Sequence, residues 1–205
     1  MKKFKSLLIL VLMAACAAHA QESTADKQWN FGADVNFYFI PHDFFILPVV
    51  RADKKALHLE ARYNYEDMET FSGWVGYNFT GGNEFEYAIT PMLGGVVGLT
   101  DGVAPGLEFT LSYKGFELYN EAEYLFDAAG SENNFFYNWA NLTYSPTDWL
   151  WFGISGQRTR LYQTDLDIQR GFILGGGSEH WEVSGYLYNI FFDDPFVMIS
   201  FSASF

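Results

Sequence analysis

After residue 28, apolar and polar residues alternate along nearly the whole chain, and this period of two constrains the fold most strongly. In the segment FGADVNFYF (31–39), every second residue is apolar and those between are mostly polar or small. The same pattern occurs in 57–65, 71–79, 85–89, 107–113 and 197–205. Because successive side chains of a strand point to opposite faces, each segment predicts a β-strand with one apolar and one polar face. We expect essentially no helix after residue 28.

Turn-forming residues divide these segments into pieces of similar length, with short and long breaks in alternation. Short breaks are expected at 53–54, 81–83, 114–115, 145–148 and 177–179. Longer or more acidic breaks are expected at 41–43, 66–69, 99–106, 127–133, 160–167 and 193–195. This division predicts twelve strands, mostly of the about 9–11 residues that a tilted strand needs to cross a membrane. The weakest segments are 44–51, which contains Pro48, and 168–175, and without one of them the barrel has ten strands.

The first twenty residues have the layout of a secretory signal peptide. Three lysines lie within the first five residues, an apolar run covers 7–15, and Ala18-His19-Ala20 supplies small residues before the cleavage site. An alternative is lipoprotein processing at Cys16, because residues 13–16 loosely resemble a lipobox. We therefore expect a signal peptide at 1–20, a short polar leader at 21–28 and a β-barrel domain at 29–205.

Charge and cysteine content exclude several classes of protein. The formal net charge is −13 and becomes −16 when the three lysines of residues 1–20 are removed, which argues against nucleic acid as a partner. The single Cys is also lost with the signal peptide, so the mature chain has no disulfide, no thiol nucleophile and no Cys-ligated metal.

The position of the aromatic residues indicates which face of the strands meets water. Aromatics make up 20% of the chain, and several stand at strand ends beside the short breaks: Phe79, Phe85, Tyr113, Phe116, Tyr144, Trp181 and Phe205. Rings prefer the headgroup zone of a membrane, whereas the core of a soluble sandwich or barrel would concentrate them in the middle of strands. The opposite face carries charges in mid-strand, which suits a watered lumen. A soluble all-β fold is the alternative.

The last nine residues carry a family resemblance. Val197, Ile199 and Phe201 alternate with polar or flexible residues, and the chain ends on Phe205. This resembles the C-terminal strand of Gram-negative outer-membrane β-barrel proteins, although Ala203 stands where a larger residue is common. The resemblance implies an all-β, closed antiparallel transmembrane barrel in the cell outer membrane. Its implied partners are outer-membrane lipid, lipopolysaccharide and the barrel assembly machinery, and we expect a monomer.

The lumen-facing acids are the candidate functional residues. A two-residue turn at 114–115 places Glu108 opposite Glu121. Opposed acids need compensation from a basic side chain crossing the lumen, a shared proton or a bound cation. The candidate selectivity residues are Glu86, Glu108, Glu117, Glu121 and Glu123, balanced by Arg62. They predict either an acidic wall that favours cations or a polar plug whose charges pair internally.

Large rings on the inward face bear on the same question. They are Trp74, Tyr119, Tyr137, Trp139, Trp151, Tyr186 and Tyr188. Such rings fill a lumen or line a path for sugars and aromatic solutes. The histidines His42, His58 and His180 have no serine nucleophile beside them in the sequence, so we expect no enzyme, no cofactor and no resident metal.

The function expected from the sequence is a small passive channel for ions or small solutes with a preference for cations. The alternatives are a non-conducting structural or adhesive barrel with a filled lumen, and a lipid-modifying outer-membrane enzyme.

Overall fold

The computed structural model describes residues 29–159, 168–192 and 194–205, so the expected signal peptide and leader lie outside the described residues. These described residues form thirteen strands and one three-residue 3-10 helix, η2 (Ser131–Asn133). The strands are β1 (Asn30–Ile40), β2 (Asp43–Lys54), β3 (Leu57–Tyr63), β4 (Phe71–Tyr77), β5 (Phe79–Gly82), β6 (Phe85–Val97), β7 (Gly102–Tyr113), β8 (Phe116–Asp127), β9 (Phe135–Thr147), β10 (Leu150–Arg158), β11 (Gln169–Ser178), β12 (Trp181–Tyr188) and β13 (Phe196–Ser204). No helix in these ranges is long and apolar enough to span a membrane.

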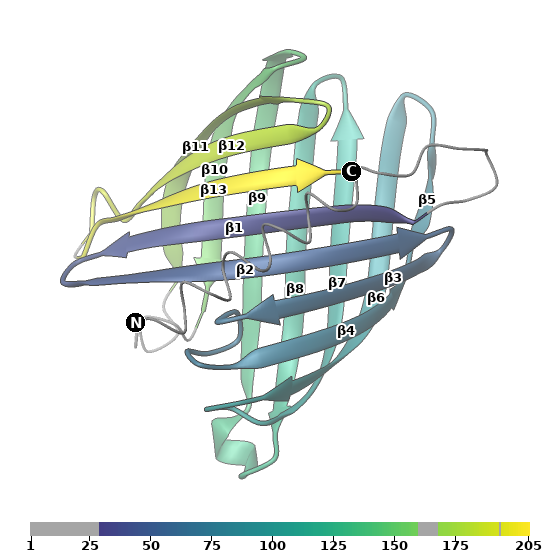
Figure 1. Ribbon diagram of the computed structural model, residues 1–205. Coiled ribbons are helices and arrows are strands. Elements are labelled where there is room, and N and C mark those ends of the chain that lie inside the picture. Colours follow the sequence, from purple (N-terminus) through teal and green to yellow (C-terminus); the bar gives the residue numbers. More distant parts are fainter. Residues whose placement is uncertain (1–28, 160–167, 193) are drawn as a thin grey trace.

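The sheet closes into an antiparallel barrel of twelve strands. β4 and β5 both pair with β6 and are separated only by Asn78, so together they act as one barrel strand. The first and last strands close the barrel: β1 pairs with β13, with Gly32 opposite Ser204 and Phe39 opposite Val197. In Figure 1, β1, β2 and β13 on the near wall cross the direction of β7, β8 and β9 on the far wall, as expected for strands tilted against the barrel axis. Closure leaves no free sheet edge.

The two ends of the barrel differ in loop length. At one end, which we call the turn end, five connections have two residues each: 55–56, 83–84, 114–115, 148–149 and 179–180. The first residue of β1 and the last of β13 also lie there. At the opposite end, the loop end, the connections include 64–70, 98–101 and 128–134. The breaks predicted at 41–43 and 99–106 both lie at this end. The first is the two-residue turn of Pro41 and His42, in which His42 takes a φ of 68°. The second was predicted too long, because β7 begins at Gly102.

Both segments with a weak sequence pattern are strands, so the ten-strand alternative was wrong. Pro48 is tolerated in β2 because the pairing of β2 with β3 begins at the next residue, Val49 opposite Arg62. A missing N–H at Pro48 therefore costs no bond in that ladder. The segment 168–175 falls mostly within β11, which pairs with β10 and β12.

The exterior of the barrel is apolar, and the interior holds the polar side chains. Along β13, Met198 and Ser200 are buried while Val197 and Phe201 are exposed. At the turn end the predicted aromatic girdle faces outward, with exposed rings at Phe79, Phe85, Tyr113, Phe116, Tyr144 and Trp181. A second outward set, which the sequence analysis missed, lies at the loop end and comprises Phe39, Phe44, Phe71, Phe126, Phe136, Phe191 and Phe192. Two aromatic belts around an apolar band are the surface that a membrane barrel presents to lipid.

Inward glycines make room for inward rings. A Cβ atom on Gly94 would come 2.5 Å from the ring of Trp74, and one on Gly106 would come 2.9 Å from it. Likewise, a Cβ atom on Gly175 would come 2.2 Å from Trp151 Nε1. The sequence analysis did not assign these glycines a partner, and the structure shows that they let large rings lie flat against the barrel wall.

Candidate functional site

An open vestibule occupies the half of the lumen next to the turn end. It has a volume of about 380 Å³ and is lined by β1–β3 and β7–β13. Its mouth is marked by side chains near the turn end, such as Glu117, Asp148 and Glu182, and its floor by Tyr65, Glu121 and Trp139. The lining includes seven acids, Asp34, Glu60, Glu108, Glu117, Glu121, Asp148 and Glu182, and one basic residue, Arg51. Acids therefore outnumber basic residues seven to one in this lining.

Arg51 pairs with one of these acids at the vestibule wall. Its guanidinium forms an ion pair with Asp34 on the neighbouring strand β1, and the Arg51 side chain is 32% exposed. Water in the vestibule therefore screens this pair, and among the lining acids Arg51 forms its ion pair with Asp34.

Arg62 forms the centre of a cluster of charged side chains at the floor of the vestibule. Its fully buried guanidinium contacts Glu60, lies 2.5 Å from Glu121 Oε1, 3.0 Å from Glu123 Oε2 and 3.5 Å from Glu108 Oε1. These contacts connect β3 to β7 and β8 across the lumen. A single guanidinium thus faces four carboxylates, which we call the Arg62 cluster, and cannot neutralise all of them.

Two rings hold the Arg62 guanidinium in place. The ring centroids of Tyr65 and Trp74 lie 4.3 Å and 4.5 Å from its central carbon. Tyr65 also donates its hydroxyl hydrogen to Glu121 and accepts one from Tyr137 at 2.9 Å. Because each partner of Arg62 has further partners, the cluster is fixed in position rather than solvated.

The structure brings together four of the six predicted selectivity residues. The predicted register of β7 and β8 is confirmed, with Glu108 opposite Glu121, and Arg62 crosses the lumen to both. Glu123 lies beside them, behind Arg62 and outside the vestibule lining.

The other two predicted acids lie apart from the Arg62 cluster. Glu117 lines the vestibule mouth and accepts a hydrogen bond from Ser112 at 3.4 Å. Glu86 is exposed at the start of β6, opposite Ser112 on β7 and Gly82 on β5. Its position is at the rim rather than among the side chains that line the vestibule.

The loop end of the lumen is filled by side chains. The loop 64–70 turns inward, so that Tyr65 is 2% and Glu66 0% exposed. Glu66 Oε1 accepts hydrogen bonds from Ser72 at 2.5 Å and from Trp74 at 3.3 Å. Burial raises the pKa of Glu66 above its ordinary value, against the lowering effect of Arg62.

Buried rings complete this closure. Further buried rings in the same half belong to Tyr38, Phe45, Phe135, Tyr137, Tyr188 and Phe196. Of the rings predicted to point inward, Trp74, Tyr137, Trp139, Tyr186 and Tyr188 are buried, and Tyr119 and Trp151 line the vestibule. The described lumen is therefore open at the turn end and closed toward the loop end.

The sequence analysis did not single out Glu60 or Tyr65, and it considered His58 only as a catalytic histidine. His58, Glu60 and Arg62 alternate on the inward face of β3, and this spacing was the available signal. The alternation in 57–65 placed Tyr65 on the apolar face with Leu57 and Leu59, and this facing was wrong, because β3 ends at Tyr63 and the following loop turns Tyr65 into the lumen. His58 makes hydrogen bonds to Asp53 Oδ1 at 2.8 Å and to Glu60 Oε2 at 3.3 Å, so both ring nitrogens face carboxylates rather than a serine.

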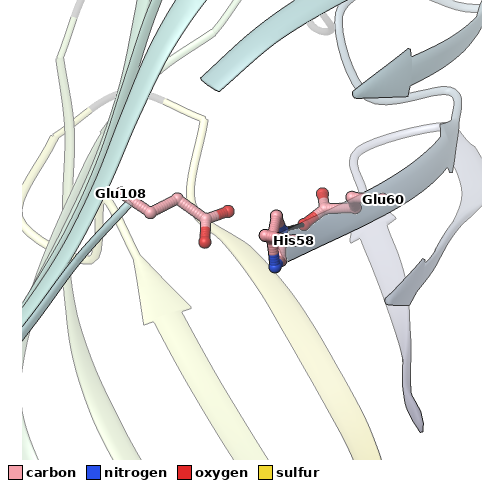
Figure 2. Close-up of side chains that lie close together, drawn as sticks. All are labelled: His58, Glu60 and Glu108. Atoms are coloured by element: carbon pink, nitrogen blue, oxygen red, sulfur yellow. Dashed lines mark hydrogen bonds and ion pairs between the residues drawn. The ribbon is translucent and has the colours of Figure 1, made fainter. Parts of the chain in front are cut away.

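His58, Glu60 and Glu108 also form a group with the composition of a metal site. One potential ligand atom from each lies within 4.8 Å of the others. Figure 2 shows Glu108 reaching from its strand toward His58 and Glu60 on β3.

Comparisons with known proteins bear on the fold. No family model matches this sequence, and no curated protein matches it. Among solved structures, the chain is similar to KdgM porin, with 12% identity and a TM-score of 0.63 over 85% of this chain and 99% of that chain. It is also similar to KdgM porin in complex with disordered oligogalacturonate, with 11% identity, a TM-score of 0.61 and the same coverage. At this level of identity, the likeness establishes the closed twelve-strand antiparallel barrel as a porin fold.

Proposed function

We propose that this protein is a porin-like channel of the outer membrane for small solutes, with a preference for cations. The observation that carries the proposal is the acidic vestibule inside a closed barrel of porin fold, with seven acids and one arginine in its lining. The apolar exterior with its two aromatic belts supports a location in a lipid bilayer. The similarity to KdgM porins supports passage of small solutes over catalysis.

Within this proposal the predicted selectivity residues have different weights. Glu108, Glu117 and Glu121 line the vestibule and meet a solute directly. Glu123 acts through Arg62, which it contacts, and Glu86 contributes only at the rim. Arg62 limits the cation preference because it offsets part of the negative charge at the floor. Contact with lipopolysaccharide, insertion by the barrel assembly machinery and a monomeric state remain parts of the proposal.

The filled loop end sets the expected size of the conductance. A solute that leaves the vestibule floor has to displace Tyr65 and the rings around it, since this half of the lumen is packed. We therefore expect small unitary currents in the wild type and larger ones in the variant Tyr65→Ala/Tyr137→Ala. The two hydroxyls bond to each other at 2.9 Å, so truncating both rings avoids leaving one hydroxyl unpaired, and Glu121 loses the hydrogen bond from Tyr65.

Planar-bilayer recording of the refolded protein in a salt gradient tests the proposal. We expect stepwise currents and a reversal potential that shows cation preference, reduced in Glu108→Gln/Glu121→Gln. The matched control is Glu84→Gln/Glu179→Gln, which removes two exposed acids in turns at the same end. Equal selectivity in both double variants would remove Glu108 and Glu121 from the mechanism.

A second candidate is a non-conducting structural or adhesive barrel, favoured by the buried rings at the loop end. It expects no currents at any voltage from the wild type or from Tyr65→Ala/Tyr137→Ala. We propose no enzymatic activity, because both ring nitrogens of the inward His58 face carboxylates, those of Asp53 and Glu60, rather than a serine nucleophile.

A further inference from the structure

The cluster of His58, Glu60 and Glu108 has the ligand types and spacing of a transition-metal site. An imidazole nitrogen and two carboxylate oxygens lie within 4.8 Å of one another, a separation that a single ion at about 2.0–2.2 Å from each ligand can bridge with small side-chain shifts. The ligands come from β3 and from β7, so the barrel wall sets their positions rather than a loop (Figure 2). His58 and Glu60 are buried, at 4% and 6% exposure.

The orientation of His58 is a second observation that points to a metal. Its Nδ1 lies 2.8 Å from Asp53 Oδ1 and its Nε2 lies 3.3 Å from Glu60 Oε2, so when Nδ1–H donates to Asp53 the other ring nitrogen is directed at the Glu60 carboxylate, where an ion between them would sit. Asp53 is itself held by Asn78 Nδ2 at 2.7 Å, and Asn78 accepts from Thr90 at 2.7 Å. A metal-bound histidine typically donates its other ring hydrogen to a carboxylate in this way, which fixes the tautomer and raises ligand basicity.

The charge around the cluster also favours a cation. Arg62 faces the four carboxylates of its cluster, and Arg51 is paired with Asp34. The two carboxylate oxygens of Glu60 have different partners: Oε1 accepts from Arg62, and Oε2 faces His58. The contact of Arg62 to Glu108 is the longest of the four, at 3.5 Å, so the Glu108 carboxylate is the one most easily redirected to an ion.

A route to the site exists from the turn end. Glu60 and Glu108 both line the open vestibule, while the loop end of the lumen is packed. A hydrated cation entering at the turn end would reach these carboxylates after passing Glu117 and Glu182 near the mouth. Water in the vestibule can complete the coordination beyond the three protein ligands.

We propose that His58 Nε2, Glu60 and Glu108 bind one divalent transition-metal ion of the zinc type at the wall of the vestibule, with Asp53 orienting the histidine. Mixed imidazole and carboxylate ligands suit Zn²⁺ better than Ca²⁺ or Mg²⁺, which prefer oxygen alone. The site does not depend on conduction, so it would exist in either the channel or the non-conducting barrel. The competing state is a protonated His58 that bridges Asp53 and Glu60 with no ion.

The test is Zn²⁺ binding to the untagged, refolded barrel in detergent, followed by calorimetry and by metal analysis after dialysis. We expect one ion per chain at pH 7.5, with binding that weakens as the pH is lowered, because protons compete with the metal for its ligands. His58→Gln and Glu108→Gln should each weaken binding at least tenfold, and Asp53→Asn by about 10–100-fold, as for outer-sphere partners of other metal sites.

Matched controls separate this site from adventitious binding. His180→Gln removes an exposed turn histidine, and Glu182→Gln removes an acid from the same vestibule, so both should bind Zn²⁺ like the wild type. X-ray absorption of the Zn²⁺ complex should show nitrogen and oxygen ligands with one imidazole. Heat-modifiable gel mobility checks that each variant is folded, and Glu108→Gln alone decides the matter if His58→Gln does not fold. No binding by the folded wild type, or equal binding by folded Glu108→Gln, would overturn the proposal.

Discussion

Replacing Arg62 with Met should be among the most destabilising single changes in the barrel at neutral pH. Met fills a similar volume between Tyr65 and Trp74 but leaves the carboxylates of the Arg62 cluster without their cation. Removing one partner of a buried ion pair costs about 3–5 kcal/mol. Losing two cation–π contacts, with centroids at 4.3 Å and 4.5 Å, adds about 0.5–2 kcal/mol each, so we expect a total of about 4–6 kcal/mol after allowing for non-additivity.

Urea unfolding in detergent micelles, followed by tryptophan fluorescence, measures this loss. The difference from wild type should shrink toward pH 4, because the orphaned carboxylates then take up protons and lose their charge. Arg51→Met is the matched control: Arg51 is one-third exposed and pairs with Asp34, so its loss should cost less than about 1 kcal/mol. A cost below about 1 kcal/mol for Arg62→Met at pH 7 would refute the reasoning that the four carboxylates depend on Arg62.

Three further predictions test packing, burial and facing. Gly94→Ala should destabilise the barrel by about 1–3 kcal/mol, because its Cβ would lie 2.5 Å from the ring of Trp74. Gly95→Ala is the control: no atom lies within 4 Å of its Cβ, so the unfolding free energy should change by less than about 0.5 kcal/mol. Burial raises the pKa of Glu66, so the wild type should lose stability as the pH rises from the ordinary carboxyl range through that raised value. Glu66→Gln should flatten this part of the curve of unfolding free energy against pH. An unchanged curve would contradict the burial of a titrating Glu66. Leu93→Arg, at a side chain 56% exposed toward lipid, should cost about 2–4 kcal/mol in vesicles, and a neutral effect there would argue against a lipid-facing wall.

The sequence predicted the wall of the barrel well because strand alternation and tight turns are local. The turn at 114–115 fixes the register that sets Glu108 opposite Glu121, and the structure confirms that pairing. Alternation also placed Arg62 and the large rings on the inward face. Pro48 weakened the prediction for its strand, because the sequence does not show that the pairing of β2 with β3 begins only at the next residue, Val49.

The arrangement inside the lumen was only partly predictable because it depends on contacts between distant strands. Tyr65 lies in a loop and reaches Glu121, which is 56 residues away in the chain. The role of His58 depends on Asp53 across a turn and on Glu108 from β7, and neither relation shows in a strand pattern. The break predicted at 99–106 extended too far because glycine and proline in 102–106 also suggest a loop, whereas β7 begins at Gly102.

The central claim is that the apolar side chains of each strand face lipid and the polar ones face the lumen. Spin labels placed one at a time on cysteines at 197–202 of β13, in vesicles, test it through their accessibility to oxygen and to a water-soluble nickel complex. We predict oxygen maxima at Val197, Ile199 and Phe201, and minima at Met198 and Ser200, which are buried inside the barrel. An opposite phase, or no alternation along the strand, would contradict the claim.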